Sequence, residues 1–216
     1  MFLEPLDSMQ VIGFEDQATY LSEASQPLRD IAKVMLGTGM RPEEVFRMRV
    51  ENIDFKQGSI FNPFGKTKAA RRTIPMTVDV VSLLKARALK AEKTGSSFVF
   101  PSPHDIEKPI GSVKKAHQTA MKRAGIKSHF RLYDLRHTFA TRAVASGVDL
   151  PTLSALLGHA SIQMTMRYVH PAAEQKRVAI QEFDRFSTAG IIAAATAAAQ
   201  QNQKVPTKVT TVEQIN

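Results

Sequence analysis

The hydrophobic residues of this chain change their spacing once, and that change limits what the chain can fold into. From residue 14 to residue 49 the apolar residues recur with the spacing of helices, and they do so again from residue 77 onward. Between them lie three short strand-like runs separated by turn residues, at 53–55, 59–61 and 71–75. We therefore expect a mainly helical fold with one small antiparallel β-sheet, of the α+β class.

Start and stop signals divide the helical parts into segments. Prolines open several of them and glycines close most, as at Pro42, Gly125 and Gly158. We expect helices at 14–24, 27–36, 42–49, 77–90, 113–124, 134–145, 151–157, 161–168, 171–186 and 191–201. Residues 202–216 are polar and without hydrophobic period, so we expect a flexible tail there.

The charge of the chain indicates its partner. Its 216 residues hold 29 Lys and Arg against 20 Asp and Glu, a net charge of +9. The first 30 residues hold six acids and one base, so the excess belongs to the body of the chain. That excess favours a polyanion such as nucleic acid as the partner.

Composition also excludes several chemistries. The chain has no cysteine, which excludes disulfides, thiolate metal sites and cysteine nucleophiles. No segment has the features of a signal peptide or the length of a membrane span, so we expect a cytoplasmic protein without membrane contact.

Three short motifs could carry chemistry. Arg136 lies in the first turn of a predicted helix that opens at Asp134, where free backbone N–H groups favour an anion. His159 follows Gly158 at a junction between two short helices. The turn at 65–72 holds four bases. Taken singly, the three motifs are more typical of a helix cap, a surface histidine and a solvated turn.

Taken together, these motifs resemble one family. Residues 36–45 (LGTGMRPEEV) are similar to the first arginine box of the tyrosine recombinases, the phage-integrase family of site-specific DNA recombinases. The basic turn resembles the hairpin that carries that family's lysine, and residues 133–141 (YDLRHTFAT) resemble its second arginine box. Residues 157–170 resemble its final box with the nucleophile. The four boxes stand in the family's order, and the resemblance implies a tyrosine-recombinase catalytic domain with the DNA breaking-rejoining fold.

The resemblance implies a reaction that needs neither metal nor other cofactor. Tyr168 would attack a phosphodiester of double-stranded DNA, leaving a 3′-phosphotyrosine link and a free 5′-hydroxyl. Arg41 and Arg136 would grip the phosphate, because a guanidinium stays charged and binds two oxygens at once. His159 would donate a hydrogen bond to the same phosphate.

Further roles follow from the same resemblance. Glu44, one turn after Arg41, would orient that arginine by ion pairing. Lys66 matches the hairpin lysine that protonates the leaving 5′-oxygen, and Lys68 is the alternative in this flexible turn. We expect the other bases of the turn to contact the DNA backbone: Lys68, Arg71 and Arg72.

The sequence departs from the family at Tyr133. That position is most often a histidine, which would accept the proton of the nucleophile. A tyrosine can hydrogen-bond the phosphate but is a weak base near neutrality, so the general base is left open. His137 adjoins Arg136, and since one residue along a helix turns the side chain by about 100°, we expect His137 to be structural.

The resemblance also divides the chain. Residues 1–13 would be a lead-in, 14–187 the catalytic domain, 188–201 a C-terminal helix that docks on a neighbouring protomer, and 202–216 a flexible tail. Only about 13 residues precede the first catalytic helix, so we expect the family's separate core-binding domain to be absent from this chain, which would be either a catalytic domain cut from a longer protein or a shortened relative. We expect a monomer in free solution and a homotetramer on paired DNA sites.

Other interpretations stay open at this point. The chain could be a weak or inactive DNA-binding module of the same fold. It could be a regulator, since residues 138–166 could form a helix-turn-helix, although the Arg41 box would then be unexplained. A type IB topoisomerase shares this kind of site, but the 157–159 box favours a recombinase.

Overall fold

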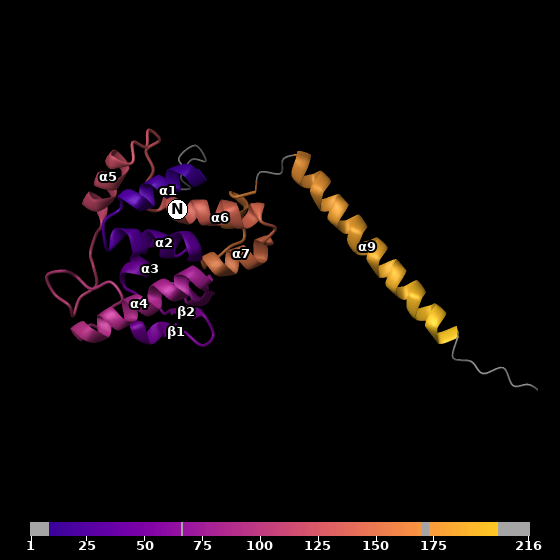
Figure 1. Ribbon diagram of the computed structural model, residues 1–216, viewed down its shortest axis with the longest axis horizontal. Coiled ribbons are helices and arrows are strands. Elements are labelled where there is room, and N and C mark those ends of the chain that lie inside the picture. The colour runs from indigo at the N-terminus through magenta and orange to yellow at the C-terminus, as the bar shows by residue number, and fades with distance from the viewer. Residues whose placement is uncertain (1–8, 66, 170–172, 203–216) are drawn as a thin grey trace, which may run out of the picture. The chain divides into compact units, whose positions relative to one another are not determined.

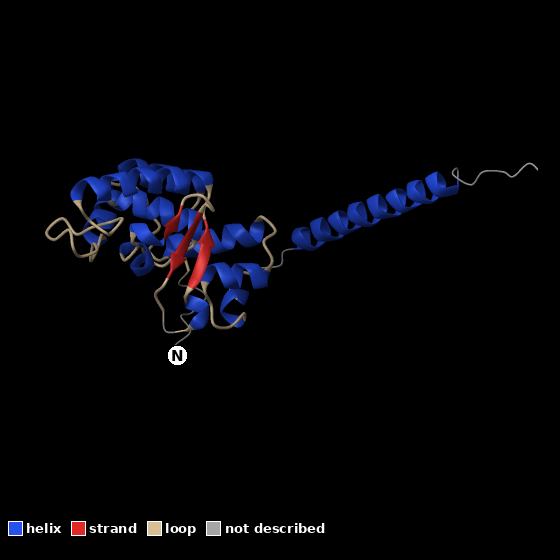
Figure 2. Ribbon diagram, turned by 90° about the horizontal axis from the view of Figure 1, so that it is seen from below, coloured by secondary structure: helices blue, strands red, loops and turns tan. Residues whose placement is uncertain are grey.

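Helices make up most of the structure, and one small sheet lies among them (Figures 1 and 2). The structure is a computed structural model that describes residues 9–65, 67–169 and 173–202. The chain divides into two units, Met1–Val169 and His170–Asn216. The predicted α+β class is confirmed.

Eight helices lie in the described part of the first unit: α1 (Phe14–Glu23), α2 (Leu28–Thr38), α3 (Pro42–Phe46), α4 (Val78–Thr94), α5 (Lys114–Arg123), α6 (Asp134–Ala145), α7 (Leu150–Leu157) and α8 (Gln163–Met166). Two short 3-10 turns join them, η2 (Val50–Asn52) and η3 (Lys68–Ala70). Helix α9 (Ala173–Asn202) belongs to the second unit.

The helix α2 forms the centre of the first unit. It packs against α1, α3, α4 and α6, and Ile31, Ala32, Val34 and Met35 are fully buried. A helix with neighbours on several sides must be apolar around most of its surface, as this one is. Leu135 on α6 belongs to the same core, which therefore holds the start of α6 rigidly against α2.

The sheet is antiparallel, in the order β1 (Ile53–Asp54), β2 (Ser59–Asn62) and β3 (Arg72–Pro75). Ile53, Ile60 and Ile74 are paired across the three strands and are all buried. Side chains alternate between the two faces of a strand. Asn62 and Arg72, which pair two residues further along, therefore lie on the same buried face.

Helix α3 ends at Phe46, earlier than the predicted residue 49. The chain after it pairs with the apolar run at 98–100: the N–H of Val50 donates to the carbonyl of Ser97, and the N–H of Val99 donates to that of Met48. These two hydrogen bonds form an isolated antiparallel bridge between Arg49 and Phe98. A distant segment thus ends the helix, which no local signal could indicate.

The predicted helices at 171–186 and 191–201 are one helix, α9. The four residues between them, 187–190, include a single glycine and no proline. One glycine inside a helix costs only about 1 kcal/mol, so the helix continues through it. The predicted tail lies outside the described residues from 203 onward. Of the helices in the described ranges, none is long and apolar enough to cross a membrane.

Candidate active site

The guanidinium of Arg136 is fully buried between the ends of two helices. Its Nη1 donates to the carbonyl of Gly39 (2.8 Å), which caps α2, and its Nη2 donates to the carbonyl of Leu157 (2.7 Å), the last residue of α7. Helix C-termini carry partial negative charge, which favours a cation. Burial lowers the pKa of Arg136 to about 10, so the side chain remains charged near neutral pH.

Two glycines allow this arrangement. Gly39 and Gly158 both have positive φ (68° and 67°) and follow the ends of α2 and α7. A Cβ at Gly39 would meet the ring of Phe139 at 2.4 Å, and a Cβ at Gly158 would meet Arg72 Nη1 at 2.7 Å. Only glycine fits both the backbone conformation and the space.

One carboxylate holds Arg41 in place. Arg41 precedes the first turn of α3, and its Nη1 donates to Glu44 Oε1 (2.9 Å) while its backbone N–H donates to Oε2 (2.9 Å). Burial alone raises the pKa of Glu44, but hydrogen bonds and positive charge from Arg72, and then from Arg41, outweigh it, so the pKa lies below its usual value. Glu44 is therefore an anion that fixes Arg41, whose side chain is 28% exposed.

Arg72 differs from the expectation that it contacts DNA. Its side chain is 7% exposed, and it donates to both oxygens of Glu44 at 3.1 Å. Its Nε also donates to the carbonyl of Leu156, beside the end of α7. The register of β3 turns Arg72 to the buried face, where it supports Glu44. Lys68 and Arg71 are exposed as expected.

The other residue predicted in the basic turn, Lys66, lies outside the described residues. The residues around it line an open hollow of about 420 Å³, which also includes Arg41 and Gly158. Gly65 and Thr67 of the basic turn therefore line the same hollow as Arg41.

His159 is buried just beyond the end of α7. Its Nδ1 is 2.8 Å from the hydroxyl oxygen of Thr165, which is fully buried. Burial, and then the positive charges of Arg136 and Arg41, lower the pKa of His159 to about 3. The imidazole is therefore neutral near pH 7. When the Thr165 hydroxyl donates to Nδ1, the ring proton lies on Nε2. Thr165 lies inside the final box, but the sequence did not mark it as a partner of His159.

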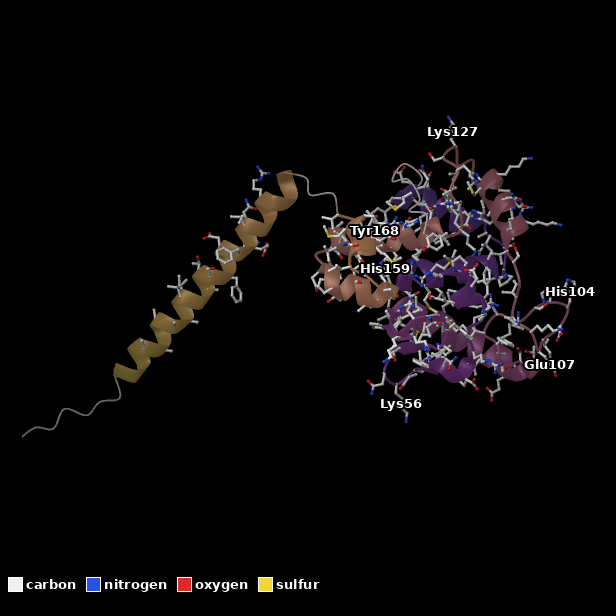
Figure 3. The ribbon with its side chains drawn as sticks, turned by 180° about the vertical axis from the view of Figure 1, so that it is seen from behind. Lys56, His104, Glu107, Lys127, His159 and Tyr168 are labelled. Carbon is white, nitrogen blue, oxygen red and sulfur yellow. The ribbon has the colours of Figure 1, made fainter. Side chains whose placement is uncertain are left out.

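Tyr168 lies beside these groups and is only 4% exposed. Its ring is stacked on that of His159 with centroids 6.5 Å apart (Figure 3). Burial raises the pKa of Tyr168 to about 12, against the opposing effect of Arg136. The phenol is therefore protonated near neutral pH, and attack requires a group that takes its proton.

His137, expected to be only structural, contacts this phenol. Its Nδ1 is 2.9 Å from the Tyr168 hydroxyl oxygen. Tyr133, one turn earlier, packs edge-on against the ring of His137, with centroids 5.0 Å apart. His137 points away from its neighbour Arg136, but it shares a helix face with Tyr133, because residues four apart lie on the same side of a helix.

The site is therefore an anion pocket with a phenol at its side. Arg41 and Arg136 supply positive charge, and the neutral His159 supplies a polar hydrogen. Among the residues that the structure describes, no three His, Asp or Glu side chains come together as metal ligands.

Glu44→Gln should lower the free energy of unfolding by about 3 kcal/mol, because Arg72 loses the carboxylate charge with which it pairs in this buried position. Urea denaturation measures the change. Glu43→Gln, at the exposed neighbouring position, is the matched control and should change stability by less than about 0.5 kcal/mol. Equal stabilities of the two variants would contradict the assigned role of Glu44.

Known proteins share this fold. The catalytic domain of bacteriophage HP1 integrase superposes with a TM-score of 0.58 at 24% identity, covering 80% of this chain and 94% of that one. The integrase of transposon Tn1549, solved in complex with transposon right end DNA, gives a TM-score of 0.68 at 22% identity, covering 84% of this chain and 67% of that one.

Sequence comparison identifies the family. The tyrosine recombinase XerC of Oceanobacillus iheyensis is 27% identical over 185 residues, which cover 83% of this chain. The chain spans 59% of the length of that relative. The family model for the phage integrase family matches residues 7–175. The chain therefore belongs to the phage integrase family, and its matched region is a tyrosine recombinase catalytic domain.

Proposed function

We propose that this chain cleaves and rejoins double-stranded DNA at specific sites through a 3′-phosphotyrosine intermediate. The observation that carries the proposal is the position of the Tyr168 hydroxyl, beside a buried, charged Arg136 and a neutral His159. Since DNA is its substrate, we place its action in the cytoplasm.

The geometry suits attack on a phosphodiester. The extra negative charge that develops on the phosphate oxygens faces Arg41 and Arg136, which are already oriented by Glu44 and by two backbone carbonyls. Donors that are held in place before the reaction stabilise the transition state without further reorganisation. The Tyr168 oxygen forms a bond to phosphorus, the bond to the 5′-oxygen breaks, and that oxygen takes a proton.

Exposed bases of the basic turn support DNA binding. Lys68 and Arg71 lie at the surface of the turn before β3, where they can contact neighbouring phosphates. Such contacts position the duplex without selecting a sequence, and they weaken as salt is added.

A nicked suicide substrate tests the reaction, because cleavage releases a short strand and traps the covalent adduct. We expect a protein–DNA species on a denaturing gel that forms with wild type and is absent with Tyr168→Phe. Tyr133→Phe, which changes a tyrosine of the same site outside the nucleophile position, should still form it. If no site yields an adduct, a DNA-binding module of the same fold is favoured instead.

The identity of the general acid is tested with a substrate that carries sulfur in place of the bridging 5′-oxygen. A thiolate leaves without a proton, so loss of the acid becomes harmless. We propose Lys66 as the acid: Lys66→Ala should cleave ordinary DNA at least about 100-fold more slowly and regain its rate on the sulfur substrate. Rescue of Lys68→Ala, with Lys66→Ala indifferent, would assign the role to Lys68.

We further propose that α9 docks on a second copy of this chain in a homotetramer on paired DNA sites, and that the free protein is a monomer. Ile180, Phe183 and Ile191 are exposed on α9. At about 100° per residue they fall on one stripe of the helix, together with the small residues Gly190 and Ala194. An apolar stripe beside small residues suits a groove on another subunit.

Phe183→Asp should therefore abolish the four-subunit complex on paired sites, measured by analytical ultracentrifugation, while leaving adduct formation on a single site within about twofold. An aspartate costs little at an exposed position but is costly when buried in an interface. Thr188→Asp, off the stripe, is the control with the same added charge. Loss of assembly in both variants, or in neither, would contradict docking through this stripe.

A further inference from the structure

We propose that His137 is the proton acceptor for Tyr168, with Asp134 as the positioning residue that keeps the accepting nitrogen of His137 free of a proton. The inference rests on the proposed function, since it concerns the step in which Tyr168 attacks. It identifies the general base, which the tyrosine at position 133 left undetermined.

The contact between the two side chains is direct and enclosed. His137 Nδ1 and the Tyr168 hydroxyl oxygen are 2.9 Å apart, which is within ordinary hydrogen-bond length. The side chain of His137 is 2% exposed. A general base must lie within hydrogen-bond reach of the proton that it removes, and His137 meets that condition before any substrate binds.

Asp134 determines which nitrogen of His137 carries the proton. Its Oδ1 is 4.0 Å from His137 Nε2, and Nε2 is buried with no hydrogen-bond partner among the described residues. A proton on Nε2 faces a carboxylate, whereas a lone pair there would be repelled by it. The Nε2–H tautomer is therefore favoured, and it leaves the lone pair of Nδ1 directed at the phenol.

Asp134 is itself held rigidly. It is 1% exposed and accepts hydrogen bonds from the backbone N–H of Arg131 (2.7 Å) and from Arg131 Nη2 (3.2 Å). These contacts fix the position of the carboxylate relative to the first turn of α6. The arrangement follows the order carboxylate, imidazole, hydroxyl that activates nucleophiles in many enzymes.

Tyr133 cannot take this role itself. Its phenol is a weak base near neutrality, and its ring packs on the edge of His137. Because the two residues are one helical turn apart, His137 lies on the same face of α6. The basic nitrogen is thus displaced by one turn along the helix.

The proton balance of the step is complete. As the Tyr168 oxygen bonds to phosphorus, its O–H bond breaks and the proton passes to His137 Nδ1, giving an imidazolium. The bond from phosphorus to the 5′-oxygen breaks, and that oxygen takes its proton from the lysine of the basic turn. In rejoining, the imidazolium returns its proton to the departing Tyr168 oxygen.

The charged groups around His137 keep it neutral in the free protein. Burial lowers its pKa to about 4, Asp134 opposes this, and the positive charges of Arg131, Arg136 and Arg167 add to it. Tyr133 and Tyr168 are the titratable groups that contact its ring. A bound phosphodiester places negative charge beside these arginines, and so favours the imidazolium that forms during attack.

Single-turnover adduct formation on the suicide substrate, followed from pH 6 to pH 9, tests the proposal. Asparagine places an amide oxygen near the position of Nδ1, so His137→Asn keeps an acceptor for the Tyr168 hydroxyl and loses only basicity. We expect it to be at least about 100-fold slower than wild type at pH 7. Its rate should rise steeply with pH as the phenol ionises, whereas the wild-type rate should change far less.

Two controls separate this role from others. The sulfur-bridged substrate should not rescue His137→Asn, because its defect lies in the nucleophile and not in the leaving group. His129→Asn, at an exposed histidine, should match wild type. A His137→Asn variant with the wild-type rate, or a slower one whose pH profile runs parallel to wild type, overturns the proposal. Absence of any wild-type adduct overturns the proposed function itself.

Nitrogen NMR of the histidine rings in the wild-type protein measures the tautomer of His137 directly, so this test does not depend on the folding of a variant. The ring of His137 should show the Nε2–H tautomer, and Asp134→Asn should shift the population toward Nδ1–H. A wild-type ring protonated at Nδ1 overturns the proposal, because that nitrogen could not then accept the proton of Tyr168.

Discussion

The burial of a permanent positive charge at Arg136 is the constraint on which the rest of the structure depends. A guanidinium removed from water is costly unless its N–H groups are satisfied. Here the carbonyls that end α2 and α7 accept from Nη1 and Nη2, whereas Nε has no hydrogen-bond partner among the described residues. Both helices must therefore stop at this point and face each other. The core around α2 and the glycines at both helix ends serve that geometry. The two carbonyl dipoles favour the buried charge, and the negative charge of Glu44 also favours it.

The site keeps its positive character because its acids are already engaged. Glu44 is shared between Arg41 and Arg72. These three side chains therefore carry a net positive charge, to which Arg136 adds another. The buried histidines do not add to this charge, since their pKa values are lowered. A phosphate therefore meets cations and neutral donors in fixed positions. The same excess of positive charge favours the binding of an anion at this site.

The fold class and the order of the boxes could be predicted from the sequence, because hydrophobic period and motif spacing are local properties. Arg72 could not be placed, because its burial follows from the register of β3 against β2. The contact of His137 with Tyr168 could not be predicted, because the two residues are 31 positions apart. Thr165 lies inside the final box, but its contact with His159 follows only from the fold.

The short stretch of chain between Tyr168 and α9 limits where α9 can go. Ala173, the first residue of α9, is five residues beyond Tyr168, and a chain extends at most about 3.6 Å per residue. The first turn of α9 therefore begins within about 18 Å of the Tyr168 Cα. If α9 docks on another copy, the groove that receives Ile180, seven residues further along the helix, must lie within about 29 Å of that Cα. The short connection would then allow only those arrangements of subunits in which a neighbouring copy lies close to the reacting tyrosine.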